Sequence, residues 1–312
     1  MSATSLRRAA WAGLQDSMPR AALLSIHARV EKATPSSWEH PSLAQVWGPR
    51  FSAYVVPARD HAIFTLGRLP EGESGRVAED LAARLHTSLK GRRLGHTEAV
   101  GPLGLRHPNQ IRYATTTGRI LIRWAGAREP TLWTVPAPKI SPQRARLELA
   151  RRYLHVFGPG TSGSFAEWAG IDPARGRPIF DALAKSLLPV RTPIGDAWML
   201  SSDERAVRAK PGHPAPARLI PSGDTYFLLQ GADRALLVPD ARRRATLWTS
   251  RVWPGAVLVA GEIAGIWRRD AANVKIDTWR RLSRAERDAV EAEAQSMPLP
   301  DVAGRIRVSW SA

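Results

Sequence analysis

The chain has 312 residues, 45 Lys and Arg against 28 Asp and Glu, a net charge of +17 and no cysteine. Without cysteine, disulfides, thiolate nucleophiles and zinc fingers are excluded. Because there is neither an apolar signal region at the N-terminus nor an apolar run of 18 residues, we expect a cytoplasmic protein with no membrane partner.

The length supports two or three modest hydrophobic cores rather than one. The positive charge comes mostly from arginine, which binds phosphate bidentately. Arginine is also enriched by high-GC genomes, so the charge favours a nucleic-acid partner only together with a matching fold.

The first expected segment covers residues 1–70. Its second helix has Pro19 in the first turn and apolar residues at helical spacing. The expected elements are helices at 6–14, from 16 onward and at 60–66, and a strand at 52–56. This order is compatible with an irregular winged helix, although periodicity alone does not show one.

The second expected segment covers residues 71–140 and opens with a linker at 71–75. A helix with apolar residues four apart follows, and residues 108–117 are the candidate recognition helix, with a polar Thr115–Thr117 run. The other expected elements are helices at 77–89 and 96–100 and a hairpin, interpreted as the wing, at 119–124 and 131–135.

Polar and basic side chains of these two segments are candidates for DNA contact. Asn and Gln read adenine edges, and Arg reads guanine or binds phosphate. A solvated polar surface explains any one of them equally well. The candidates are Arg50, Arg92, Arg93, Asn109, Gln110, Arg112, Arg123 and Arg128.

The third expected segment, residues 141–201, has the clearest pattern. A helix ends at Gly158-Pro159-Gly160, and a short helix capped by Thr161 or Ser162 ends at Gly170. Asp172 then caps a third helix, and strands at 188–191 and 197–200 follow. Three helices and a hairpin are the order of a winged helix, which on a basic chain predicts binding to duplex DNA.

The last segment, residues 202–312, starts with a linker at 202–220 and is expected to be a small β-rich domain. Ser283 and Glu286 form a capping box at the start of its one helix. The expected strands lie at 226–238, 245–252, 256–259, 263–267, 274–279 and 305–310. The predicted fold class is therefore α+β, with tandem winged-helix units and a C-terminal β-rich domain.

The usual signatures of cofactor and metal sites are missing from the sequence. It contains no P-loop, GxGxxG or GxSxG motif, and its eight histidines never fall in a His-x3-His pattern. We therefore expect neither a cofactor nor a metal.

Five stretches of the chain resemble the AlkZ-like winged-helix proteins. These are bacterial DNA glycosylases that remove bulky N7-alkylated purines and unhook interstrand crosslinks. The resemblance implies three winged-helix units and a C-terminal β-domain around duplex DNA. The matching stretches are 47–50 together with 55–60, 151–159, 165–170, 257–269 and 281–293.

The resemblance places the catalytic motif at His27-Ala28-Arg29, where the chain departs from the family. The family has two Gln, or a Gln and an Asp, around one apolar residue, and the pair is thought to position water. Two residues at i and i+2 converge only on an extended backbone, since on a helix they diverge by about 200°. We therefore expect the triplet at or past the end of the second helix.

The two polar residues of this motif, His27 and Arg29, each have a chemical and a structural interpretation. A neutral His27 can hold or deprotonate the attacking water, with Glu31 four residues on to orient it. Arg29 would oppose a sugar cation, so phosphate binding or pairing with Glu31 is expected for it. In the structural interpretation, His27 and Arg29 only cap a helix and contact the DNA backbone.

Together these patterns predict a duplex DNA-binding protein, interpreted as a DNA-repair glycosylase with an altered active site. Its predicted substrates are N7-alkylated purines or interstrand crosslinks. The alternative is a non-catalytic winged-helix protein, a regulator or architectural protein. Several winged helices in one chain without a dimerisation heptad favour a monomer in the nucleoid.

Overall fold

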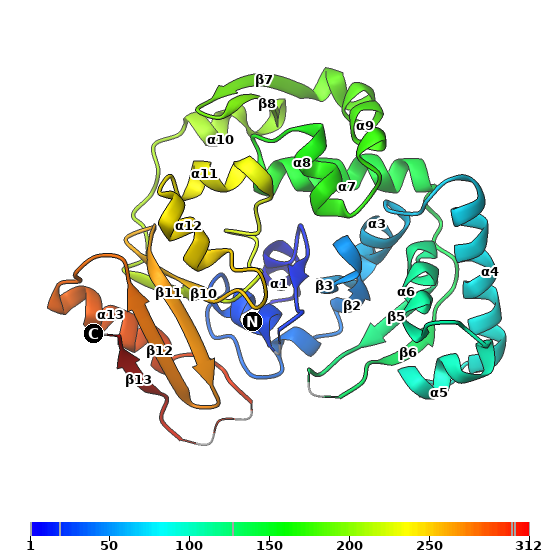
Figure 1. Cartoon of the computed structure of the whole chain (residues 1–312), viewed down its shortest axis with the longest axis horizontal. Coiled ribbons are helices and arrows are strands. Elements are labelled where there is room, and N and C mark those ends of the chain that lie inside the picture. Colours follow the sequence, from blue (N-terminus) through cyan, green and yellow to red (C-terminus); the bar gives the residue numbers. More distant parts are fainter. Residues whose placement is uncertain (1, 19, 127, 301, 303, 312) are drawn as a thin grey trace.

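The computed structural model describes residues 2–18, 20–126, 128–300, 302 and 304–311. It has a mixed α+β fold (Figure 1). The C-terminal sheet lies at one end of the molecule and the helices of the second segment at the other, with the third segment above both.

The first segment starts its elements at different positions from those expected. The first helix ends at Ala9, and the second begins at Ala21 rather than near Asp16. Gly13, at φ +77°, turns the chain into a short strand between them. Pro19 lies outside the described residues. The elements are α1 (Ala3–Ala9), β1 (Leu14–Gln15), α2 (Ala21–His27), β2 (Leu43–Trp47), β3 (Ala53–Pro57) and α3 (His61–Leu66).

The second segment begins with a helix that includes most of the expected linker. The expected recognition helix is reduced to four α-helical residues between two 3-10 turns. The elements are α4 (Gly72–Leu89), β4 (Leu94–Gly95), α5 (His96–Val100), α6 (Ile111–Ala114), β5 (Ile120–Arg123) and β6 (Thr131–Thr134). The predicted hairpin is thus confirmed.

The threonine run Thr115–Thr117, expected to face DNA, is buried instead. Each hydroxyl donates to the carbonyl three residues earlier, at 2.6–2.7 Å. These hydrogen bonds satisfy the hydroxyls inside the core, which leaves them unable to read bases.

One antiparallel sheet joins the first and second segments, in the order β1-β3-β2-β5-β6-β4. The two halves meet where Gln45 pairs with Ile122. The buried Gln45 side chain accepts from the Trp124 N–H (2.6 Å) and donates to Asp16 (2.8 Å). The segments at 1–70 and 71–140 therefore share a sheet, a feature that the separate sequence patterns did not show.

The third segment folds where its caps predict. Thr161 accepts from the Ser164 N–H, Asp172 accepts from the Ala174 N–H, and Gly170 has φ +67° at the end of α8. Aromatic side chains of α7 and α8 pack together in its core. The elements are α7 (Pro142–Phe157), α8 (Ser162–Ala169), α9 (Gly176–Leu183), β7 (Leu187–Thr192) and β8 (Gly195–Leu200). They have the expected order of three helices and a hairpin.

The last segment contains a five-stranded sheet, in the order β13-β12-β11-β10-β9. The capping box of Ser283 and Glu286 and the helix after it are confirmed. The elements are α10 (Glu204–Arg208), β9 (Ala217–Ile220), α11 (Arg234–Leu237), α12 (Ala241–Leu247), β10 (Gly255–Val259), β11 (Glu262–Asp270), β12 (Asn273–Thr278), α13 (Arg284–Gln295) and β13 (Arg307–Trp310).

Two predictions for this segment are wrong. Residues 226–238 and 245–252 are loops and the helices α11 and α12, not strands. Asp240 caps α12 by accepting from two backbone N–H groups, which the alternation of apolar residues did not indicate. The expected linker at 202–220 also contains α10 and the sheet-edge strand β9.

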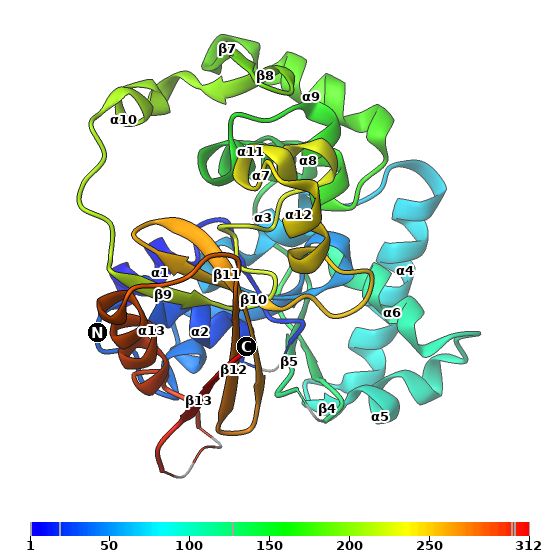
Figure 2. The same ribbon diagram turned by 60° about the vertical axis from the view of Figure 1, so that its left-hand side comes forward.

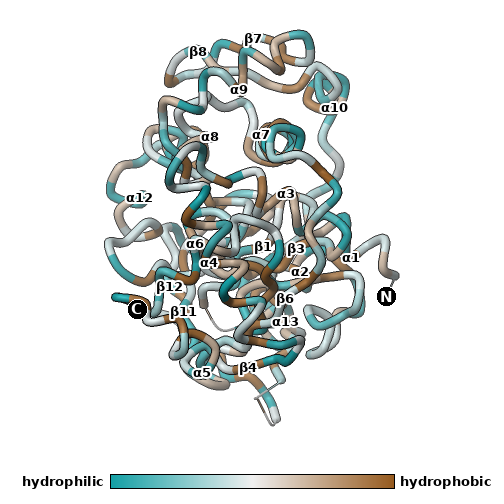
Figure 3. Tube along the Cα trace, turned by 90° about the vertical axis from the view of Figure 1, so that its right-hand side faces the viewer, coloured by the Kyte–Doolittle hydropathy of each residue, from teal (hydrophilic) through white to brown (hydrophobic). Residues whose placement is uncertain are grey.

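Helix α2 packs against the last segment, although 190 or more residues separate them. Figure 2 shows α2 beneath β9 and beside α13, and Leu24 is buried in the core of the C-terminal sheet. Hydrophobic and hydrophilic residues are interspersed along the tube in Figure 3. Among the described residues, no helix has the length and apolarity to cross a membrane.

Burial of Asp16 predicts a pH-dependent contribution to stability. Burial raises the pKa of Asp16 from 3.8 to about 7, against the hydrogen bonds from Ala22 and Gln45 that lower it. The folded state thus binds this proton more tightly than the unfolded chain, and stability falls as the pH rises from 3.8 to about 7. Over this pH window, we expect the thermal midpoint of the wild type to fall relative to that of Asp16→Asn. At higher pH, the difference between the two midpoints should stay constant. A difference that does not change with pH would contradict the assignment.

Candidate active site and nucleic-acid interface

The triplet His27-Ala28-Arg29 lies at the end of α2. The helix ends at His27, and Ala28 stays in the right-handed helical region, with φ −64° and ψ −15°. Because the backbone is not extended here, the side chains of His27 and Arg29 diverge. The position at the helix end agrees with expectation, but the two side chains have different partners.

His27 faces α13 and is largely buried, with 14% of its side chain exposed. Its Nε2 lies 3.1 Å from Ser296 Oγ and 3.9 Å from a Glu293 carboxylate oxygen. The Ser296 hydroxyl donates its proton to the Glu293 carbonyl (2.7 Å), so its oxygen accepts from His27 Nε2–H. This network leaves Nδ1 as the unprotonated nitrogen.

The same surroundings keep the imidazole neutral. Burial lowers the pKa of His27 below 6.5, the nearby Glu293 opposes this shift and Arg218 adds to it. The residues that orient His27 are Glu293 on α13 and Ser296 directly after it, not Glu31 as the sequence suggested. The result is a neutral histidine whose Nδ1 makes no hydrogen bond to any of the described residues.

Arg29 makes a bidentate ion pair with Asp224. Its two terminal nitrogens donate to the two carboxylate oxygens at 2.7 and 2.6 Å, and it also donates to the Ser25 carbonyl and Thr225 Oγ1. The Asp224 side chain is fully buried and that of Arg29 is 28% exposed. Although burial raises the pKa of Asp224, the Arg29 guanidinium lowers it further, below its usual value. The expected pairing with Glu31 is therefore wrong.

Removing one partner of this pair is expected to lower the free energy of unfolding far more than removing both partners. Arg29→Ala leaves the buried Asp224 carboxylate uncompensated, a loss of about 3–5 kcal/mol in the free energy of unfolding. The double variant Arg29→Met/Asp224→Asn removes that charge and should recover most of the loss. Chemical denaturation measures both. Arg208→Ala, which breaks an exposed ion pair with Glu204, is the control and should cost about 0–1 kcal/mol.

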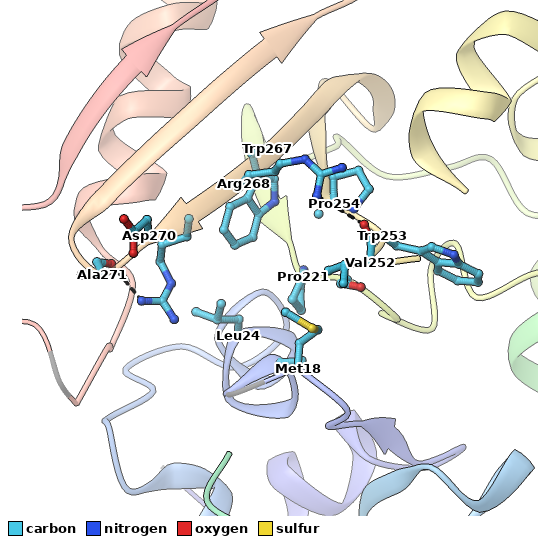
Figure 4. A pocket seen from close by; sticks show the side chains of 14 residues that line it. Met18, Leu24, Pro221, Val252, Trp253, Pro254, Trp267, Arg268, Asp270 and Ala271 are labelled. Atoms are coloured by element: carbon cyan, nitrogen blue, oxygen red, sulfur yellow. Dashed lines mark hydrogen bonds between the residues drawn. The ribbon is translucent and has the colours of Figure 1, made fainter. Parts of the chain in front are cut away.

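A cavity of about 350 Å³ lies between α2 and the C-terminal sheet (Figure 4). Leu24, one helical turn before His27, lines it from α2. Trp267 faces Leu24 and Met18 across the cavity, whereas Arg268 donates to the Val252 carbonyl (3.3 Å). Val252, 51% exposed, lies at the edge of the cavity. The cavity is mainly apolar and has the size of a small-molecule site.

Five of the eight candidate DNA contacts have exposed side chains. Arg93 stacks over Trp133 (4.5 Å) and Arg123 over Trp38 (4.8 Å), which holds both guanidinium groups near the surface. Arg123 also lies 3.7 Å from Glu39. The exposed candidates are Arg92, Arg93, Asn109, Arg123 and Arg128.

The other three candidates, Arg50, Gln110 and Arg112, are half-buried. The Gln110 side chain accepts from the His107 backbone N–H, completing a capping box. Arg50 and Arg112 line one cavity, described below. These three side chains thus have contacts within the protein that the sequence did not indicate.

Sequence reasoning missed Asp224, Glu293 and Ser296, the residues that hold the triplet in place. They lie 195 or more residues from their partners on α2. No local pattern marks such a contact. Over the part of the chain that the structure describes, no group of three or more His, Cys, Asp or Glu side chains is arranged to hold a metal ion.

Two comparisons with known proteins return matches. A family model described as DNA glycosylase AlkZ-like matches residues 8–298. The structure is similar to that of the Streptomyces sahachiroi DNA glycosylase AlkZ, with a TM-score of 0.76, 18% sequence identity, and coverage of 98% of this chain and 94% of that one. At this identity, the likeness shows a shared fold. None of the curated proteins searched matches the chain.

The family match defines the class of protein as DNA-binding hydrolases of DNA repair. Within that class, the chain belongs to the AlkZ-like DNA glycosylases.

Proposed function

We propose that this protein hydrolyses the N-glycosidic bond of N7-alkylated purines, or of purines in interstrand crosslinks, in duplex DNA. One observation carries the proposal beyond the family. His27, at the position of the family's catalytic motif, is a neutral imidazole whose Nε2–H is held by Ser296 and whose Nδ1 has no hydrogen-bond partner among the described residues.

The proposed reaction needs one well-placed base. N7-alkylation leaves the purine positively charged, so it departs with the electron pair of the C1′–N9 bond. Water then attacks the sugar cation at C1′, and its proton passes to His27 Nδ1. Ser296 and Glu293 keep that nitrogen unprotonated by fixing the proton on Nε2.

Arg29 has a positioning role in this proposal. A free guanidinium next to C1′ would repel the developing positive charge. The bidentate pair with Asp224 offsets that charge and ties the end of α2 to the loop after β9. The departure from the family's motif is then compatible with hydrolysis, because His27 supplies the base and the Arg29–Asp224 pair supplies rigidity.

The apolar cavity beside α2 supports a bulky adduct as part of the substrate. Leu24 lines the cavity (Figure 4). His27 is three residues further along α2, which places it on the same side of the helix. An alkyl or aromatic substituent inserted in the cavity would be buried against Trp267 and Leu24.

Duplex DNA is the proposed partner, bound by a cytoplasmic, nucleoid-associated monomer. Three of the five exposed candidates are at the hairpin of the second segment, which we interpret as a wing: Arg123 ends β5, Arg128 lies between β5 and β6, and Arg93 stacks over Trp133 of β6. The other two are Arg92 and Asn109. Four of the five are arginines suited to phosphate contact. Their binding is expected to weaken steeply with salt.

The decisive experiment measures release of bases from duplexes that contain N7-methylguanine or an interstrand crosslink. We expect abasic sites with the wild type and a single-turnover rate about a hundredfold or more lower with His27→Ala, the typical loss for a missing general base. His213→Ala, at an exposed position in the linker, is the control and should be unaffected. Tight DNA binding by a folded wild type that releases no base would refute the proposal and favour a non-catalytic DNA-binding protein.

The pH dependence of base release gives a separate test of His27. Since burial lowers its pKa below 6.5, the resting His27 is neutral at pH 7 and is already protonated before the reaction only at lower pH. We expect a rate that is level across neutral pH and decreases below pH 6.5 as Nδ1 becomes protonated. His27→Gln, which does not titrate, should lose this decrease. If the decrease persists in His27→Gln, another group is the base.

A further inference from the structure

Three arginines surround the turn that joins β2 to β3. Arg68 donates to the carbonyls of Ala169 and Trp47 and stacks over the Phe51 ring (4.5 Å). Arg112 stacks over the Trp47 ring (5.4 Å), and Arg50 donates to Gln15 Oε1 (3.2 Å). These three side chains, here called the arginine cluster, come from different parts of the first and second segments.

The arginine cluster differs from the other buried arginines in its partners. Over the described residues, none of its members pairs with a carboxylate, in contrast to Arg29, Arg146 and Arg152. Arg68 Nη2 and Arg112 Nε are buried without a hydrogen-bond partner. Burial, with repulsion from Arg50, lowers the pKa of Arg68 to about 9, although Tyr54 opposes the shift. Charge held inside a protein without an anion is costly, so the cluster favours binding one.

The backbone at the arginine cluster is strained. Arg50 and Phe51 are consecutive residues with left-handed φ values of +53° and +56°, which side chains larger than glycine rarely adopt. The end of α8 fits closely against this turn, because a Cβ at Gly170 would lie 2.8 Å from the Arg50 backbone nitrogen. Such strain persists where the surroundings enforce it, and it is concentrated at functional sites.

A cavity of about 290 Å³ opens between Arg50 and Arg112. Its walls are aromatic and its polar groups are cationic or neutral. It is lined by Ser17, Trp47, Arg50, Phe51, Ser52, Ala53, Arg112, Trp124 and Pro130. No carboxylate is among these residues, so the cavity selects for a small anion.

We propose that this cavity is a phosphate-binding pocket that takes one backbone phosphodiester of duplex DNA. The inference rests on the proposed function for the identity of its ligand. Arg50 and Arg112 contact the phosphate oxygens. Arg68 is a positioning residue, since it contacts Trp47 and Phe51 at the β2–β3 turn. A free phosphate has the same charge chemistry, but Trp124 directly follows Arg123 and leads toward Arg128, both exposed, and such a row of cations fits a continuous strand.

The first test compares binding to an undamaged duplex, by fluorescence anisotropy, over a range of salt concentrations. Each phosphate contact contributes about 0.9 to the slope of log K against log salt. We expect Arg112→Gln and Arg50→Gln each to reduce that slope by about 1, whereas Arg112→Lys, which keeps the charge, should retain most of it. Arg208→Gln, from an exposed ion pair on α10, is the control. Thermal melting confirms that each variant is folded.

The second test separates a DNA phosphate from a free anion. Inorganic phosphate should raise the thermal midpoint of the wild type but not that of Arg112→Gln. If phosphate stabilises the wild type while the variants retain the full salt slope on DNA, the pocket binds a free anion and the DNA assignment is wrong. If folded variants and the wild type have the same salt slope and the same thermal response to phosphate, the cavity does not bind phosphate.

Neither test depends on catalysis, so the two proposals fail separately. A wild type that releases bases while its variants keep the salt slope would refute the pocket alone. A wild type without glycosylase activity, but with the predicted loss of slope in the variants, would refute the proposed reaction alone.

Discussion

The buried pair of Arg29 and Asp224 connects the two ends of the chain. Arg29 is the last residue of the motif at the end of α2, and Asp224 follows β9 of the C-terminal sheet. Leu24 is buried in the core of that sheet, and His27 contacts α13. Three separate contacts thus connect one seven-residue helix and the residues at its end to the last segment. An ion pair of this kind adds little stability relative to apolar packing, but it fixes geometry, since either partner alone is strongly unfavourable.

This constraint also determines what the motif can do. With Arg29 occupied by Asp224, the only side chain of the triplet with a free basic atom is His27. The network through Ser296 orients the imidazole, as a second residue orients the base in many catalytic sites. The cavity beside Leu24 lies at the same contact between α2 and the sheet. Residues far apart in sequence therefore meet around one short helix, and the departure at the third motif position has a structural partner in Asp224.

Local signals were sufficient for much of the fold. Caps at Thr161, Asp172 and Ser283 set helix starts that depend only on neighbouring residues. The prediction of strands is wrong at α11 and α12. Apolar alternation in a short segment does not show whether a partner strand is present. The shared sheet also depends on a distant contact, that of Gln45 with Trp124.

The candidate site was less predictable than the fold because it depends on contacts between residues that are far apart in the sequence. The resemblance located His27 and Arg29, but Asp224 and Ser296 are joined to them only by tertiary packing. Residue type likewise did not separate exposed arginines from buried ones. Arg112 and the neighbouring threonines looked like a polar helix face, and it is packing against Trp47 that turns Arg112 inward.

That distinction between arginines gives the net charge of +17 two roles. Exposed arginines such as Arg92 attract a duplex wherever it lies, because Coulomb attraction between solvated charges is weakly directional. The proposed pocket, with Arg50 and Arg112 on its walls, would accept a phosphate at one position only. Phosphate contacts set the register of a protein on DNA. In the proposed reaction His27 would depend on such a register, because Ser296 holds its ring in place. The rigid base at the end of α2 and the rigid phosphate pocket at the β2–β3 turn therefore belong together in the proposed enzyme: the pocket sets the position of the strand, and the helix sets the position of the base.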